Sequence, residues 1–233
     1  MSMNEKSRAR GSLTVIGLGP GRAGLVTKES WSLMEKAERL VLRTEIHPTV
    51  ETLREAGIAF TSYDKFYESA GSFQTLYRTI AGDLIRRAEQ GEKIVYAVPG
   101  SPFVAEQTVS LLREEAKEHS IPLKILPGMS FMEALYASLN IDPIEGLAIL
   151  DAETIVEKSV SCSVAKVVTQ IYSQQVASET KLFLMEEYPD EYGITYLHHL
   201  SLEDEEIRQI PLYELDRQPD IDHLTCLFIP PVR

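Results

Sequence analysis

The segment Leu13-Thr-Val-Ile-Gly-Leu-Gly-Pro-Gly21 decides the fold class of this chain. A short β-prone run ends in a turn with three glycines in five positions. Glycine has no Cβ, so the backbone of such a turn can approach a ligand closely. In open α/β sheets, ligands bind beyond the carboxyl ends of the strands. The segment therefore predicts a buried strand and a ligand-binding turn, with a tight turn that binds nothing as the alternative.

Strands and helices of similar length alternate after this turn. Apolar residues at helical spacing and Gly/Pro breaks mark the boundaries. Such alternation is typical of βαβ units with a largely parallel sheet. The sequence predicts helices over 27–38, 49–56, 73–90, 103–119 and 130–139, and strands over 39–43, 94–98 and 123–126.

The pattern changes after about residue 141. Val164, Val167, Val168 and Ile171 follow helical spacing and suggest a helix, whereas Leu182-Phe-Leu-Met185 is typical of a buried strand. Further strands are predicted over 194–197, 208–210 and 224–229, so we expect a mixed sheet here. The domains predicted are a disordered arm over 1–11, an N-terminal α/β domain over 12–141 and a C-terminal α/β domain over 142–233.

Composition limits the classes of function. The 233 residues are 44% hydrophobic, and 35 acidic against 23 basic residues give a net charge of -12. A duplex-binding protein needs a basic face, so we expect no nucleic-acid partner. No apolar run approaches the ~18 residues that span a bilayer, and the polar first ten residues do not form a secretory signal. Two isolated cysteines, Cys162 and Cys226, favour free thiols in a reducing compartment, the cytoplasm.

A dinucleotide-binding function is one alternative. Gly19-Pro-Gly-Arg-Ala-Gly24 matches GxGxxG, and Glu45 follows near the position of a ribose-binding acid. In that fingerprint the helix opens within the glycines, whereas here the helix signal starts later, at Thr27. Pro20 also removes an N–H donor from the turn. An NAD-linked oxidoreductase is thus a weaker interpretation.

Four segments, taken together, resemble the tetrapyrrole methylase family. They are Gly17-Leu-Gly-Pro-Gly21, Val98-Pro-Gly-Ser-Pro-Phe-Val104, Leu126-Pro-Gly-Met-Ser-Phe131 and Thr180-Lys-Leu-Phe-Leu-Met185. Each is weak alone, but their order and spacing are fairly specific over Leu13 to Pro231. The resemblance implies two α/β domains with a cofactor cleft between them. It also implies an S-adenosylmethionine (SAM)-dependent methyltransferase that forms a homodimer.

Within that family the sequence is most similar to the methylase domain that precedes a MazG-type nucleotide pyrophosphohydrolase in fusion proteins. Tyr96-Ala-Val-Pro-Gly-Ser-Pro-Phe-Val-Ala-Glu106 and Pro211-Leu-Tyr-Glu-Leu-Asp216 carry this likeness. It implies a fused or partner pyrophosphohydrolase. A second hypothesis follows, in which the chain senses SAM or S-adenosylhomocysteine (SAH) and regulates that enzyme.

The resemblance also implies which residues hold SAM, mostly through main-chain groups. A member of this family commonly has Gly-Asp-Pro where this chain has Gly100-Ser-Pro102, so the charge is missing at Ser101. Ser130 also fits an N-cap, since Glu133 completes a Ser-x-x-Glu capping box. The implied cofactor-binding residues are Gly19, Pro20, Gly100, Ser101, Phe103, Val104, Ser130, Phe131 and Met185.

Methyl transfer needs alignment more than a dedicated acid–base pair, and the sequence offers no obvious pair. Tyr63 and Tyr67, in a loop-like stretch, are candidates for the acceptor side, with a hydrophobic cluster as the alternative. The residues do not identify the acceptor, so a small molecule, a peptide and a protein all stay open. His198 and His199 lie in a strand-like run, where neighbours point to opposite faces, so we expect no metal site.

Overall fold

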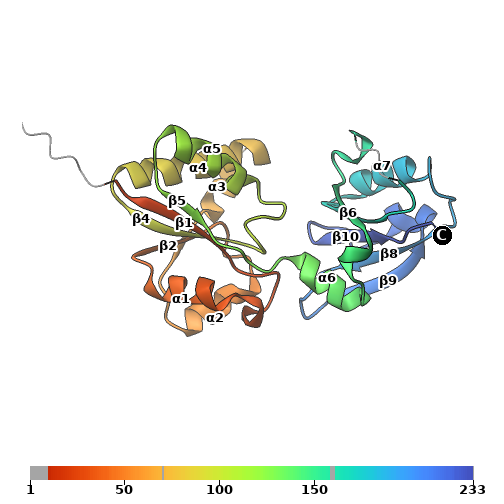
Figure 1. Cartoon of the computed structure of the whole chain (residues 1–233), viewed down its shortest axis with the longest axis horizontal. Coiled ribbons are helices and arrows are strands. Elements are labelled where there is room, and N and C mark those ends of the chain that lie inside the picture. Colours follow the sequence, from red (N-terminus) through yellow and green to blue (C-terminus); the bar gives the residue numbers. More distant parts are fainter. Residues whose placement is uncertain (1–9, 70, 158–160, 233) are drawn as a thin grey trace, which may run out of the picture. The chain divides into compact units, whose positions relative to one another are not determined.

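The computed structural model describes residues 10–69, 71–157 and 161–232. It divides into two compact units between Glu133 and Ala134. The division falls within helix α6 (Phe131–Leu139), ahead of the boundary predicted at 141/142. Each unit has its own sheet, as expected for two α/β domains (Figure 1).

The first unit contains an all-parallel sheet of five strands. Its order is β3-β2-β4-β1-β5. The strands are β1 (Ser12–Gly17), β2 (Arg39–Leu42), β3 (Thr61–Ser62), β4 (Lys93–Val98) and β5 (Leu123–Ile125). Strand β1 pairs with β4 from Ser12↔Lys93 to Gly17↔Val98, so both strands end at the same level. The turns that follow them are therefore neighbours, although far apart in sequence.

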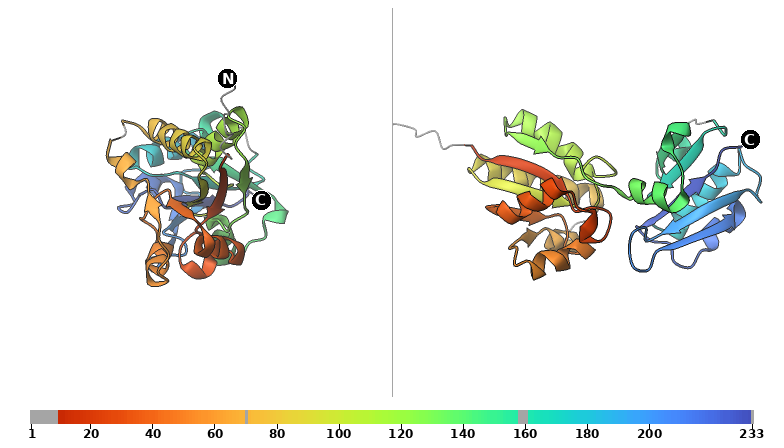
Figure 2. Two further views of the ribbon diagram at one scale, coloured as in Figure 1. Left: turned by 90° about the vertical axis from the view of Figure 1, so that its left-hand side faces the viewer. Right: turned by 60° about the horizontal axis from the view of Figure 1, so that its bottom comes forward.

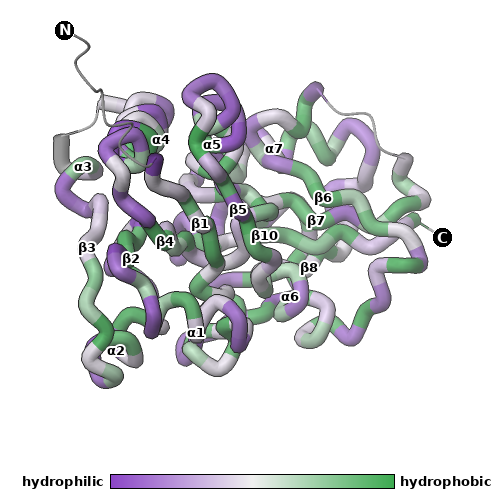
Figure 3. The backbone as a smooth tube through the Cα atoms, turned by 60° about the vertical axis from the view of Figure 1, so that its left-hand side comes forward, coloured by the Kyte–Doolittle hydropathy of each residue, from purple (hydrophilic) through white to green (hydrophobic). Residues whose placement is uncertain are grey.

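Helices cover both faces of this sheet. Helices α1 (Lys28–Lys36) and α2 (Pro48–Glu55) lie on one face, and α4 (Phe73–Glu89) and α5 (Gln107–Glu118) on the other (Figures 1 and 2). Leu13 and Val15 point into the core under α4 and α5, whereas Ile16 points into the core under α1 and α2. Because both faces are covered, β1 and β4 carry apolar residues on both sides of the sheet (Figure 3).

The second unit contains a mixed sheet, as predicted. Its order is β6-β7-β10-β8-β9, in which only β6 and β7 run parallel. The strands are β6 (Leu147–Asp151), β7 (Ala165–Thr169), β8 (Gly193–His198), β9 (Glu206–Pro211) and β10 (Thr225–Ile229). Helix α7 (Gln174–Leu184) packs on one face, where Leu184 joins Val168, Tyr196 and Leu227 in the core.

Two predictions in this unit were wrong. The region predicted as a helix contains β7, because Lys166, Val167 and Val168 are all buried in the sheet interior and β-branched residues favour strands. The run Leu182–Met185, predicted as a strand, instead closes helix α7. Ser173 caps this helix by accepting a hydrogen bond from the Val176 N–H at 3.2 Å.

Two differences concern the first unit. Helix α5 begins at Gln107 rather than Phe103, because Glu106 supplies the N-cap and accepts from the Thr108 N–H. The stretch around Tyr67, predicted as loop-like, contains the short helix α3 (Asp64–Ser69).

Two further findings concern membrane-spanning helices and the two cysteines. Every helix in the described part of the chain is too short or too polar to cross a bilayer. Cys162 and Cys226 are free thiols, as predicted.

Candidate functional site

Three glycine-containing turns of the first unit meet at the carboxyl ends of its strands. A Cβ built on Gly17 would lie 2.2 Å from the Gly100 carbonyl oxygen. A Cβ on Gly128 would lie 3.5 Å from both that oxygen and Gly17 Cα. Only glycine at position 17 permits this approach of two backbones. The structure thus brings together the turns that follow β1, β4 and β5 (Figure 1).

The first two turns are joined by reciprocal hydrogen bonds. The Gly19 N–H donates to the Gly100 carbonyl at 3.2 Å, and the Gly100 N–H donates to the Gly19 carbonyl at 2.8 Å. Both glycines have positive φ, +74° and +64°. A Cβ on Gly100 would meet no described atom within 4 Å, so this side of the turn is open. That opening is where a ligand can approach the backbone, so the residues present fit a cofactor held by main-chain groups.

Helix α2 fixes the first turn, which the sequence pattern did not indicate. The Thr49 hydroxyl lies 3.1 and 3.0 Å from the carbonyl oxygens of Leu18 and Gly21, which share its single proton. His47 Nδ1 accepts from the Thr49 N–H at 3.2 Å, so Nε2 carries the proton and donates to Gly19 O at 3.0 Å. Burial lowers the pKa of His47 to about 4. A neutral imidazole therefore holds the glycine turn.

A buried ion pair fixes the second turn. Arg43, just after β2, donates from Nη1 to Glu106 Oε2 at 2.9 Å, and the Glu106 side chain is only 2% exposed. The other Glu106 oxygen accepts from the N–H and hydroxyl of Thr108. The 63-residue separation of Arg43 and Glu106 left no local signal by which sequence reasoning could have found the pair.

The predicted cofactor residues of the second turn differ in exposure. Ser101 is buried, and its Oγ accepts from the Phe103 N–H at 3.3 Å, which leaves its own hydroxyl proton for a ligand. The Val104 N–H donates to the Ser101 carbonyl at 3.2 Å, and Val104 is half-buried. Phe103 is 55% exposed, with the Arg113 guanidinium 5.1 Å from its ring centroid. Ser101 and Val104 are thus part of the turn, whereas the Phe103 ring points away from the core.

Ser130 forms the predicted capping box at the start of α6. Its N–H and hydroxyl both donate to Glu133 Oε2 at 2.7 Å, and its Oγ accepts from the Met132 N–H at 3.1 Å. The N–H and the hydroxyl of Ser130 are therefore engaged in capping α6. The neighbouring Phe131 and, in the first turn, Pro20 are half-buried.

Met185 does not close a strand. It is the C-cap of helix α7 in the second unit and is half-buried against that unit's core. The match of Met185 to the family pattern rested on a strand, so its cofactor role stays a prediction without that support.

The two tyrosines proposed for the acceptor side are in different environments. Tyr63 is 5% exposed, packs against Phe66 and Tyr96, and donates to Asp83 Oδ2 at 2.8 Å. It belongs to the hydrophobic cluster that was the alternative interpretation. Tyr67 is half-buried beside that core, and burial raises the pKa of its phenol to about 12. A role for Tyr67 in holding an acceptor stays a prediction.

The predicted arrangement of His198 and His199 was wrong. His199 lies just beyond β8 with φ +53°, so the alternation of strand side chains stops there. Both rings face Asp222 instead of opposite sides of the sheet.

The features of a dinucleotide site are absent from the described first turn. A 3-10 turn over Ala23–Leu25 follows the glycines, and α1 starts only at Lys28 with Thr27 as its N-cap. The Glu45 carboxylate accepts hydrogen bonds from Arg54 at 2.6 Å and from Ser62 at 2.8 Å, so both oxygens are engaged. Both Glu45 oxygens therefore already have partners in the first unit, and the carboxylate is not free to bind a ribose.

Comparison with known proteins identifies the family. The family model described as Tetrapyrrole (Corrin/Porphyrin) Methylases matches residues 12–216. The uncharacterized protein YabN of Bacillus subtilis is 40% identical over 223 residues, which are 96% of this chain but 45% of YabN. The chain thus spans about half the length of this relative.

Solved structures show the same fold. A uroporphyrin-III-C-methyltransferase structure from Thermus thermophilus superposes with a TM-score of 0.74 at 18% identity, covering 95% of this chain and 94% of that one. Another Thermus thermophilus structure, complexed with SAH, gives a TM-score of 0.70 at 16% identity and covers 94% and 92% of the two chains. The comparisons confirm the two-sheet α/β fold and support the methylase interpretation over the NAD-linked alternative. The chain belongs to the tetrapyrrole (corrin/porphyrin) methylase family, whose methyl donor is SAM.

Proposed function

We propose that this chain transfers a methyl group from SAM to a small-molecule or peptide acceptor. The observation that carries the proposal is the convergence of the three glycine turns, together with the open space beside Gly100. The Gly100 carbonyl and the Ser101 hydroxyl would hold the cofactor, because the second turn places them at the carboxyl end of β4. Gly19 and Val104 would line the same site, with their N–H groups hydrogen-bonded within the turns.

SAM supplies an activated methyl group on its sulfonium when it is bound. The protein's own contribution is to hold donor and acceptor in line, which does not require a dedicated base unless the acceptor must lose a proton. The reciprocal Gly19–Gly100 hydrogen bonds, the His47 and Thr49 contacts and the Arg43–Glu106 pair fix the turns before a ligand arrives. Preorganisation of this kind supports binding through backbone groups.

The test is a calorimetric titration of SAH into two alanine variants. Gly100→Ala and Gly57→Ala carry the same backbone strain, since φ is +64° and +68° and neither Cβ would meet an atom within 4 Å. Each should lose about 1–2 kcal/mol of stability and stay folded. Only Gly100→Ala should weaken SAH binding, by at least tenfold, because its methyl group occupies the space next to the ligand. Equal affinities for the two variants would contradict the assignment of this turn.

A second candidate function is regulation. YabN is more than twice as long as the segment that matches this chain, which supports a methylase domain working beside another domain. From the sequence likeness we propose a MazG-type pyrophosphohydrolase as the fused or partner protein, with SAM or SAH binding as its signal. A pyrophosphohydrolase rate that changes with SAH, in a protein without methyl transfer to any acceptor tried, would favour this function.

We also propose a homodimer in the cytoplasm. The dimer follows from the family resemblance, and the free thiols favour a reducing compartment. Light scattering at micromolar concentration should give twice the 26.2 kDa chain mass. A mass equal to one chain would contradict the dimer.

A further inference from the structure

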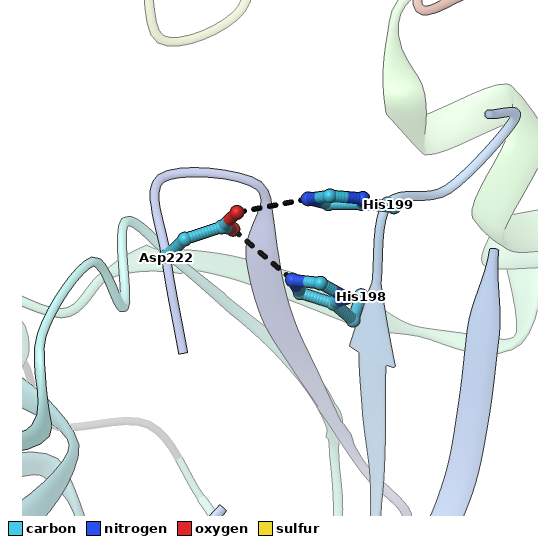
Figure 4. A group of neighbouring side chains, drawn as sticks. All are labelled: His198, His199 and Asp222. Atoms are coloured by element: carbon cyan, nitrogen blue, oxygen red, sulfur yellow. Dashed lines mark hydrogen bonds and ion pairs between the residues drawn. The ribbon is translucent and has the colours of Figure 1, made fainter. Parts of the chain in front are cut away.

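The end of β8 and the loop before β10 bring two histidines and an aspartate together in the second unit. The His198 and His199 rings stack with centroids 3.7 Å apart and planes at 18°. His199 Nε2 lies 2.8 Å from Asp222 Oδ2, and His198 Nε2 lies 3.3 Å from Asp222 Oδ1. Figure 4 shows both rings directed at the same carboxylate. One donor atom from each residue lies within 4.8 Å of the others.

A carboxylate also contacts the far side of each ring. Asp204 Oδ2 lies 2.7 Å from His199 Nδ1, and Asp220 Oδ2 lies 3.5 Å from His198 Nδ1. Carboxylates at this position orient the imidazoles of metal sites, because they hold the Nδ1 proton and direct the Nε2 lone pair at the ion. The described residues therefore supply three inner donors, with a hydrogen-bonded outer carboxylate for His199 and a more distant one for His198.

Hydrogen bonds among the described residues leave one nitrogen of this cluster without a partner. A neutral imidazole has one N–H donor, yet each ring faces a carboxylate at both nitrogens. His198 Nε2 is buried and makes no hydrogen bond to any described residue, although its side chain is only 10% exposed. Two protonated rings would instead stack two positive charges 3.7 Å apart. A divalent cation bound between the Nε2 atoms and Asp222 would give His198 Nε2 the partner that it lacks.

The local charge fits a divalent ion. Arg208 forms an ion pair with Asp220, which also accepts from the Tyr196 hydroxyl at 3.2 Å. With Asp220 neutralised, the negative charges of Asp204 and Asp222 face two neutral imidazoles. Two negative charges balance one divalent cation.

We propose that His198, His199 and Asp222 bind a divalent transition-metal ion of the zinc type. Imidazole nitrogen with carboxylate oxygen is a donor set that suits Zn²⁺. Tetrahedral bonds of about 2.1 Å place neighbouring donors about 3.4 Å apart, close to the present N···O distances of 2.8 and 3.3 Å. Because the two rings are stacked nearly parallel, one of them must also rotate so that both Nε2 lone pairs point at the ion. Three protein ligands leave the fourth position to water. The bound ion links the end of β8 to the loop that precedes β10.

The experiment uses the untagged full chain after chelator treatment and dialysis. Zn²⁺ is titrated by calorimetry, and Co²⁺ serves as a spectroscopic probe of coordination. We expect one Zn²⁺ per chain, a higher melting temperature with the ion, and visible Co²⁺ absorption typical of low coordination number. Absence of one-equivalent binding in the wild-type chain would overturn the proposal, whatever the variants show.

Variants test the ligand assignment. His199→Ala and Asp222→Asn should each weaken Zn²⁺ binding by about a hundredfold or more, and Asp204→Asn by about tenfold, since outer partners contribute less. His119→Ala is the matched control, because His119 is also paired with a carboxylate, Glu89, but lies in the other unit. Zn²⁺ affinity that falls in the control and not in the three variants would overturn the assignment. If a variant fails to fold, histidine-ring NMR shifts of the wild-type chain decide, and shifts confined to His198 and His199 are expected.

Discussion

At the scale of single residues, the protonation of His47 makes the hydrogen bonds that hold the first glycine turn depend on pH. Both of its ring nitrogens are engaged only while the imidazole is neutral, because Nδ1 accepts from Thr49 and Nε2 donates to Gly19. Burial lowers the folded-state pKa from 6.5 to about 4. A depressed histidine pKa means that the unfolded chain binds the proton more readily. The stability contributed by this residue is then fully present above pH 6.5 and is lost as pH falls toward 4.

We expect a His47→Asn variant to lose this pH dependence. Asparagine can still cap α2, but it does not titrate. Between about pH 7.5 and pH 5, the wild-type free energy of unfolding should fall by about 2 kcal/mol more than that of the variant. Urea denaturation of both proteins at the two pH values measures the difference. Parallel losses in the two proteins would show that another group is responsible.

At the scale of elements, α7 gives the sharpest test of the fold. In a strand, Leu182 and Leu184 would share one face, whereas in a helix they lie roughly 200° apart. The structure has Leu182 61% exposed and Leu184 2% exposed. We expect Leu184→Ala to cost about 2–5 kcal/mol and Leu182→Ala less than about 0.5 kcal/mol.

Chemical denaturation of the two leucine variants gives the comparison directly. Each variant is the other's control, since both remove the same side chain from the same element. Equal losses of stability would support the strand that the sequence pattern predicts and would contradict α7.

At the scale of the whole molecule, ligand-dependent stability separates the methylase from a dinucleotide enzyme. SAH should raise the melting temperature, and NAD should leave it unchanged, because α1 starts too late to face a pyrophosphate and Glu45 is already hydrogen-bonded. A ligand at a hundredfold excess over its Kd stabilises the folded state by about 2.7 kcal/mol. A thermal shift with NAD and none with SAH would contradict the proposed methylase function and favour a dinucleotide-binding enzyme.

The sequence by itself determined the features that depend on local chemistry. The glycines after β1, β4 and β5, the Thr27 cap and the Ser130–Glu133 capping box lie where the pattern predicts them. The reason is that capping joins residues only a few positions apart, and the positive φ of Gly19 and Gly100 is a property of the single residue. The parallel sheet of the first unit follows in the same way from strand–helix alternation.

Only the tertiary structure decided the features that depend on distant contacts. Burial in a sheet made 165–169 a strand despite its helical spacing, and packing on that sheet made 174–184 a helix despite its apolar end. The Arg43–Glu106 pair and the meeting of His198 and His199 with Asp222 join residues that sequence spacing does not relate. In each case the stabilising free energy comes from burying side chains and from pairing polar groups that are distant in sequence. These contributions outweigh the intrinsic helix or strand propensity of the segment.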